Sequence, residues 1–300
     1  MTAGQINTQN AGWYRFRVGA LECTTVWDGY IHHSYDGIFP NADPAEMLRL
    51  KQAYRLPLDH IPMDLNPVVV NTGDMLILID AGMGRTSKMF GDKMGRLAEN
   101  MAAAGINPSD IDAVLMTHLH PDHSFGLINP DGTALFPNAD LYCCDVDWAE
   151  WTDETSLTRN DFRAPWTKGT LEATAPYRGR VKLFKAGDTI LPGVSTFSVA
   201  GHAAGMCAYI FESGGAKVVF TGDVAHHQVF DPHHPEWFFH MDYDTNPQQG
   251  ADAKKAIFGK VIAENIRFHG YHFPYPGIGD LEQVADGTYR WHGEQVIPRL

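Results

Sequence analysis

A short segment in the middle of the chain, THLHPDH at residues 117–123, holds four side chains of the kind that bind metal ions. Because side chains alternate along an extended chain, we expect His118, His120 and Asp122 to point to one side. Pro121 interrupts strand pairing and lets the chain turn, so His123 can approach the same region. Imidazole suits zinc and neighbouring first-row metals, and a carboxylate adds negative charge for a second cation. The segment therefore predicts a metal site.

The run His-x-His-x-Asp-His resembles the signature of the metallo-β-lactamase superfamily, and later segments match that family's pattern in order. These segments are Gly201-His202 after an apolar strand, Phe220-Thr221-Gly222-Asp223, and Tyr271-His272-Phe273-Pro274. The resemblance covers about residues 14–292. Each later segment also has an ordinary explanation: a structural histidine, a turn aspartate or an aromatic-cluster histidine. Their shared order favours the ligand interpretation.

The resemblance implies a binuclear centre that holds two divalent metal ions, with zinc favoured and manganese, cobalt or iron as alternatives. It assigns three histidines to the first metal, three residues to the second and one carboxylate to both: His118, His120 and His202; Asp122, His123 and His272; and the shared Asp223. Two such ions lower the pKa of a bridging water, and the resulting hydroxide attacks the substrate. Catalytic roles then fall to Asp223 and to Asp122, which can pass a proton to the leaving alkoxide. Met206 replaces a histidine that is common in the family, so hydrogen bonding around the ligands should differ.

The C-terminal part of the chain resembles the branch that contains methyl parathion hydrolase and quorum-quenching lactonases. The matching segment runs from Pro235-Glu236-Trp237 through Asp242-Tyr243-Asp244 to His272-Phe273-Pro274-Tyr275-Pro276-Gly277-Ile278-Gly279. That branch implies neutral, apolar substrates: a lactone of the acyl-homoserine-lactone type or an aryl ester, with an organophosphate triester as the alternative. Candidate substrate contacts are mostly aromatic, and core packing is the alternative for each aromatic residue. They are Phe39, Phe125, Trp148, Trp151, His226, Phe230 and Phe273. His227, beside His226, is open to either a catalytic or a solvated role.

Two other classes of protein stay open at this point. A persulfide dioxygenase-like oxidoreductase resembles this fold but uses a single iron ion, and the residues of the second metal argue against it. A binding protein with a vestigial site is the other class, and the complete ligand set argues against that.

The composition and the charge of the chain favour small molecules as its binding partners. The formal net charge of −13 over 300 residues should repel nucleic acid. No stretch approaches the roughly 20 apolar residues that span a bilayer, so no membrane association is predicted. Residues 1–10 lack the basic and apolar regions of a signal peptide, which favours the cytoplasm. The four cysteines form no CxxC pair and are expected to be reduced thiols. A homodimer that packs through the N-terminal segment and residues 31–63 is left open.

The elements that must position these residues are mostly strands. We predict two strands in residues 14–30, a hairpin in 67–80, and a buried strand over 111–116 that leads into the motif. Residues 31–63 read as a long loop with a helix over 44–54, and residues 88–104 and 247–265 as helices. Further strands are expected at 139–143, 181–184, 194–200, 207–212 and 216–221. The fold class is therefore α/β (α+β): a four-layer αβ/βα sandwich of two mixed β-sheets flanked by helices. Residues 1–12 are expected to be a flexible extension and 13–300 a single domain.

Overall fold

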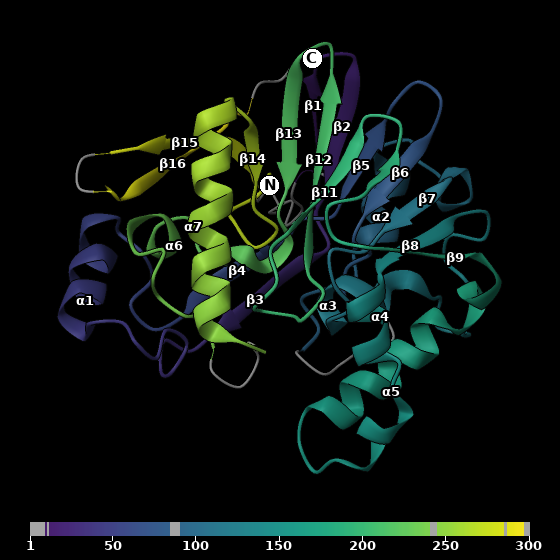
Figure 1. Ribbon diagram of the computed structural model, residues 1–300, viewed down its shortest axis with the longest axis horizontal. Helices are drawn as coiled ribbons and strands as arrows, with labels where there is room; N and C mark the ends of the chain where they lie inside the picture. Colours follow the sequence, from purple (N-terminus) through teal and green to yellow (C-terminus); the bar gives the residue numbers. More distant parts are fainter. Residues whose placement is uncertain (1–9, 11, 85–90, 241–244, 285–286, 297–300) are drawn as a thin grey trace, which may run out of the picture.

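Two seven-stranded mixed sheets and seven α-helices make up most of the part of the chain that the computed structural model describes, namely residues 10, 12–84, 91–240, 245–284 and 287–296 (Figure 1). The first sheet has the order β1 (Trp13–Val18), β2 (Leu21–Val26), β5 (Val68–Asn71), β6 (Leu76–Ile79), β7 (Ala113–Leu115), β8 (Asp140–Cys144), β9 (Val181–Phe184). The second has the order β10 (Thr189–Leu191), β11 (Val194–Ser198), β12 (Cys207–Ser213), β13 (Ala216–Phe220), β14 (Arg267–His269), β15 (Ile278–Gln283), β16 (Tyr289–Gly293). A separate ribbon pairs β3 (Gly29–His33) with β4 (Ile61–Leu65). The helices are α1 (Pro44–Ala53), α2 (Leu97–Ala103), α3 (Pro121–Ser124), α4 (Asp145–Trp151), α5 (Arg163–Thr174), α6 (Phe230–His233) and α7 (Pro247–Glu264).

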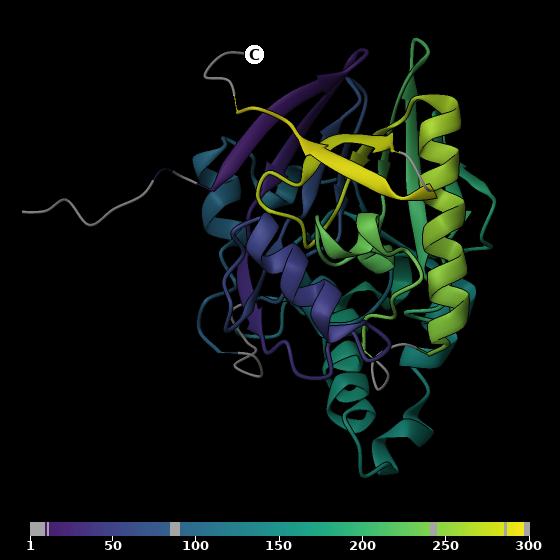
Figure 2. The same ribbon diagram turned by 90° about the vertical axis from the view of Figure 1, so that its left-hand side faces the viewer.

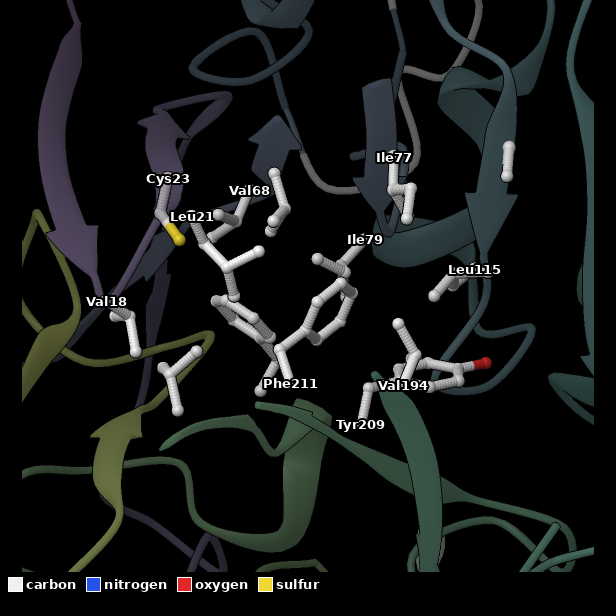
Figure 3. Close-up of a cluster of buried hydrophobic side chains, with 14 of the residues drawn as sticks. Val18, Leu21, Cys23, Val68, Ile77, Ile79, Leu115, Val194, Tyr209 and Phe211 are labelled. Carbon is white, nitrogen blue, oxygen red and sulfur yellow. The ribbon is translucent and has the colours of Figure 1, made fainter. Parts of the chain in front are cut away.

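The main core lies between the two sheets. Alternate residues of each strand point inward, so Ile79 and Leu115 of the first sheet share one cluster with Tyr209 and Phe211 of the second (Figure 3). The four cysteines are free thiols and all are buried. Adjacent Cys143 and Cys144 face opposite sides of β8, since one belongs to the outer cluster and the other to the inter-sheet core. Because buried residues point to both sides of a strand, both faces of each sheet are apolar. The outer faces therefore need helices to cover them.

Helices cover the two outer faces. Leu97 of α2, Trp151 of α4 and Trp166 of α5 belong to the cluster on the outside of the first sheet. On the other side, Ile257 and Phe258 of α7 pack on the second sheet. Figure 2 shows α7, the long yellow-green helix, running alongside that sheet. The four-layer sandwich predicted from the sequence is therefore confirmed. Among the described residues, no helix combines the length and apolarity required to cross a bilayer.

The structure differs from the sequence predictions in two places before the metal-site motif. Residues 31–63 are not simply a loop, because β3 and β4 pair along their length and α1 lies between them. The helix predicted over 88–104 is only α2; residues 88–90 lie outside the described chain, and Gly91 and Gly95 adopt φ of +105° and +80°, which a helix does not allow. The predicted extension over 1–12 falls mostly outside the described residues, and the single-domain assignment stays a prediction.

A small separate core forms where the β3–α1–β4 excursion meets the segment around α6. Phe39, Leu50 and Met63 from the excursion pack with Phe230 and Trp237 there. The β3–β4 ribbon lies at the same end of the sandwich as α3 in Figure 1. This small core, the satellite core, therefore covers one end of the two sheets.

Candidate metal centre

The predicted ligands leave the ends of strands from both sheets. His118 and His120 follow β7, and His202 lies between β11 and β12. Asp223 follows β13, and His272 follows β14. Asp122 and His123 sit in the first turn of α3, where Pro121 occupies a helix-start position, so the turn of the helix and not strand alternation directs Asp122.

The turn before Asp223 has a specific backbone requirement. Gly222 has φ of +54°, and a Cβ at that position would lie 2.7 Å from the hydroxyl of Thr117. Glycine is the residue that tolerates both conditions. The close approach brings the end of β13 against the start of the histidine motif.

The structure gathers the seven predicted ligands into two adjacent groups whose donor atoms lie within 4.8 Å of one another in each group: His118, His120 and His202; and Asp122, His123, Asp223 and His272. In the first group, His202 Nε2 lies 2.9 Å from His120 Nδ1. Asp223 stands between the groups. Its Oδ1 is 3.0 Å from His123 Nε2, while its Oδ2 is 3.4 Å from His202 Nε2 and 3.1 Å from His272 Nε2.

Hydrogen bonds on the far side of three imidazoles fix which nitrogen is left for a metal. His123 Nδ1 lies 2.8 Å from the Asp80 carboxylate, and His272 Nδ1 lies 2.9 Å from the carbonyl oxygen of Asp64. Thr117 donates its hydroxyl proton to Asp80, so it accepts from His118 Nδ1. Because these partners accept, each Nδ1 carries the proton and each Nε2 presents a lone pair to the centre.

Several buried polar atoms at the centre lack a hydrogen-bond partner among the described residues: His118 Nε2, His123 Nε2, His226 Nε2 and Asp223 Oδ1. His123 Nε2 and Asp223 Oδ1 are 3.0 Å apart, yet the pair does not have hydrogen-bond geometry. Buried polar atoms are rarely left without partners, and converging nitrogen and oxygen lone pairs are what a cation satisfies. The donor set therefore fits divalent first-row metal ions.

The electrostatics of the site agree with that fit. Burial disfavours a charged imidazole and lowers the pKa of His118 and His120 well below 6.5, with neighbouring histidines adding to the effect. Burial acts the same way on His123, but the carboxylates of Asp223, Asp122 and Asp80 outweigh it and raise its pKa. Burial would raise the pKa of Asp223, but His123, His272 and His226 outweigh it and hold that pKa well below 3.8. The negative charges of Asp223, Asp122 and Asp80, which favour a proton on His123, favour a metal cation at the same place as well.

A cavity of about 390 Å³, including its solvent-facing part, opens onto these groups. Its polar side is formed by ligands and by His33 and His226, and its apolar side comes from several elements. The apolar lining residues are Ile31, Met63, Trp166 and Phe239. Sequence reasoning missed these four and His33, and it missed the buried Asp80 behind His123. For Asp80 a signal was present, because it ends the apolar run Leu76–Ile79 in the same way that the motif follows β7.

Of the seven residues predicted to contact substrate, His226 lines this cavity. The other six are not among its lining residues in the described chain. Phe39 and Phe230 belong to the satellite core, Phe273 packs beneath α7, and Phe125 packs with Tyr271. Trp148 and Trp151 pack in the outer cluster of the first sheet, and the Trp151 ring lies 5.0 Å from that of His120. Their surroundings are those of core residues, and a substrate role for them stays a prediction.

Comparison with known proteins places this site in a family. Residues 62–254 match the Metallo-beta-lactamase superfamily. The hydrolase AbOPH of the β-lactamase superfamily superposes with a TM-score of 0.88 at 28% identity, covering 96% of this chain and 99% of that one. AidC, a dizinc quorum-quenching lactonase solved with the product N-hexanoyl-L-homoserine, gives 0.84 at 25%, covering 95% and 98%. A probable metal-dependent hydrolase from Staphylococcus aureus shares the fold at 0.76 and 23% identity, covering 94% and 100%. This chain belongs to the metallo-β-lactamase superfamily.

Proposed function

We propose that this protein is a binuclear metal-dependent hydrolase of neutral, apolar esters, with acyl-homoserine-lactone-type lactones first and aryl esters second. The observation that carries the proposal is the position of Asp223. One of its oxygens adjoins His123, and the other adjoins His202 and His272, so one carboxylate touches both donor groups. A shared carboxylate of this kind sets the spacing of two metal ions.

The charge of the cavity supports a neutral substrate. No lysine or arginine lines the cavity within the described residues. Burial, reinforced by His272 against the opposing charge of Asp122, lowers the pKa of His33 to about 4, so this residue is neutral at pH 7. Three arginines that could otherwise match a negative charge form ion pairs with carboxylates: Arg159 pairs with Asp161, Arg163 with Glu150, and Arg267 with Glu294. A phosphodiester, which carries a charge that needs matching cations, is therefore disfavoured relative to an ester.

The lining of the cavity suits a substrate with both a polar and an apolar part. Ligand pockets are mostly apolar, with a few placed polar groups that fix the orientation of the ligand. Ile31, Met63, Trp166 and Phe239 offer apolar contact for an acyl group, while the ligands occupy the other side. This two-sided lining suits a molecule with one polar, reactive group and a short apolar tail.

When bound, a pair of divalent cations supplies an activated water and polarises the scissile carbonyl. The chain's residues then position and protonate the substrate. Asp122 retains 14% side-chain exposure, whereas Asp223 retains 4% and His123 none. A carboxylate oxygen of Asp122 thus reaches the cavity and is placed to accept the proton that the attacking water releases and to pass it to the leaving oxygen. The apolar wall limits access of bulk water to the reacting group.

The relatives support the same chemistry. AidC is described as a lactonase with a lactone-hydrolysis product bound, and AbOPH as a hydrolase. An organophosphate triester is the second candidate, because a lining without lysine or arginine among the described residues suits a neutral triester as well as an ester. We expect the triester to react more slowly. We take zinc as the first metal to test. A cytoplasmic location and a homodimer remain predictions from the sequence.

The test compares kcat/KM for N-hexanoyl-homoserine lactone, phenyl acetate, a neutral phosphotriester and bis-p-nitrophenyl phosphate, measured side by side. The enzyme is first stripped with a chelator and then reloaded with zinc, manganese or cobalt. We expect the lactone or the aryl ester to lead and the chelated protein to be inactive. Preference for the phosphodiester would overturn the substrate class. No hydrolysis of these compounds, together with a single iron ion per chain, would favour the persulfide dioxygenase-like alternative.

A further inference from the structure

A second cavity lies directly behind the first. Its space, including the part that is open to solvent, is about 280 Å³, and it is bounded by the start of α7 and the segment between α6 and α7. The two cavities share four lining residues, His202, Asp223, His226 and Phe239, so they are neighbours with a common wall. The remaining lining of the second cavity is largely apolar and includes Val199, Met206, Val224, Trp237 and Ala251.

Two stacked rings, which are not among the predicted metal ligands, form part of that wall. The rings of His226 and Phe239 lie face to face, with centroids 3.4 Å apart and planes 2° from parallel. His33 meets the edge of Phe239 at 6.2 Å, and Phe39 meets it at 6.0 Å. The other shared residues, His202 and Asp223, are predicted metal ligands and are therefore fixed. Phe239 is thus the side chain in the wall whose size can vary without changing the metal centre.

A buried ion pair holds both rings in place. Asp231 accepts hydrogen bonds from the backbone N–H groups of His226 and His227 at 2.8 and 2.7 Å. Lys254 of α7 donates to Asp231 and also to the carbonyl oxygen of Trp237, at 2.9 Å for the latter. One lysine therefore ties the segment that carries His226 to the segment that carries Phe239. Its charge is neutralised by Asp231, so it leaves the second cavity apolar in character.

We propose that Phe239 determines the longest acyl chain that the enzyme accepts, because its ring closes the active-site cavity against the second cavity. A smaller side chain at position 239 joins the two spaces and extends the apolar path from the ligands toward α7. The inference rests on the proposed ester-hydrolase function and adds a specificity-determining residue to it. Longer acyl tails then gain apolar contact that the present wall denies them.

The experiment measures kcat/KM of metal-loaded protein for p-nitrophenyl acetate, butyrate and octanoate. For Phe239→Ala we expect the octanoate-to-acetate ratio to rise by about tenfold or more over the wild type, since each added methylene contributes to binding when it is buried. Phe239→Leu should give a smaller rise and covers the case in which the alanine variant folds poorly. Calorimetric titration with butyrate and octanoate gives a readout independent of turnover, and octanoate should gain affinity in the variant.

Two further variants make the outcome specific to the joined cavities. Adding Ala251→Leu to Phe239→Ala refills the second cavity from α7, and it should return the ratio toward the wild-type value. Phe197→Ala, a half-buried phenylalanine of β11 outside both linings, should leave the ratio unchanged. An unaltered ratio in both Phe239 variants overturns the inference. A wild type that cleaves neither these esters nor N-hexanoyl-homoserine lactone overturns the proposed function instead.

Discussion

His123 Nδ1 donates a hydrogen bond to Asp80 at 2.8 Å, and both side chains are essentially excluded from solvent. Asp80 also accepts from the backbone N–H and the hydroxyl of Thr117, each at 2.8 Å. Its backbone has φ of +57°, a conformation that aspartate and asparagine tolerate better than most residues. Asp80, the first residue after β6, thus orients the imidazole of His123 on α3. It also holds Thr117, which begins the histidine motif, in place.

Replacing Asp80 by asparagine should weaken metal binding without unfolding the protein. The amide keeps the shape and tolerates the backbone, but it loses the negative charge that makes His123 a strong ligand. Loss of such a partner typically lowers metal affinity by about 10- to 100-fold. Competition with a zinc chelator measures the change. Asp112→Asn is the matched control, because Asp112 accepts a hydrogen bond from the backbone N–H of Leu76, far from the ligands. Equal metal affinities in the two variants would contradict the role of Asp80.

Asp223 should be required for binuclear metal loading. We expect about two metal ions per chain in wild-type protein purified without chelator, because the donor atoms form two groups that share this carboxylate. Asp223→Ala removes the shared oxygens, so metal content and ester hydrolysis should both fall sharply while the circular dichroism spectrum persists. Asp74→Ala, an exposed turn aspartate between β5 and β6, serves as the control for a purely local turn role. Near wild-type turnover in the Asp223 variant would show that it is only a turn residue.

The sandwich could be anticipated because strand alternation and helix spacing are local patterns. The runs before His118, His202 and Asp223 were apolar and short, as buried strands are, and their ends carry the candidate ligands. The ribbon of β3 and β4 was missed because its partners are separated by α1 and their histidines and prolines hide the period. The pairing from Gly29↔Leu65 to His33↔Ile61 is a non-local contact that no window of sequence reveals.

The cavity wall was harder to predict than the metal centre. The motif residues lie close in sequence, whereas Ile31, Trp166 and Phe239 come from three segments that are far apart in the chain. The predicted aromatics Phe39 and Phe230 lie one layer behind: the Phe39 ring is 6.0 Å from Phe239 and 5.5 Å from Phe230. Aromatic character alone does not distinguish a lining ring from the ring that supports it, because both bury apolar surface.

The Asp231–Lys254 pair should matter greatly for stability. Asp231 is fully buried and Lys254 is 3% exposed, so Lys254→Met leaves a buried carboxylate without its counter-charge. Breaking a buried pair in this way typically costs about 3–5 kcal/mol. Urea unfolding of metal-loaded protein measures the change. The control is Lys217→Met, which removes a solvent-screened pair with Glu264 and should cost far less unfolding free energy. Equal losses of unfolding free energy in the two variants would show that the buried pair stabilises the fold no more than the exposed pair does.

Trp166, rather than Trp148, should contact the substrate. Trp166 lines the cavity, and its ring lies 5.0 Å from the ring of His120. Trp148 packs in the outer cluster of the first sheet and is not among the lining residues of the described chain. Because an aromatic wall binds the acyl group in the ground state and the transition state alike, Trp166→Ala should mainly raise KM and lower kcat/KM by about tenfold. Trp166→Phe should recover much of that loss, and Trp148→Ala should leave KM near the wild-type value. Steady-state kinetics on phenyl acetate and N-hexanoyl-homoserine lactone, with metal content checked for each variant, decides between the two tryptophans. If Trp148→Ala raises KM and Trp166→Ala does not, the substrate binds over α4 and the cavity described here is not its site.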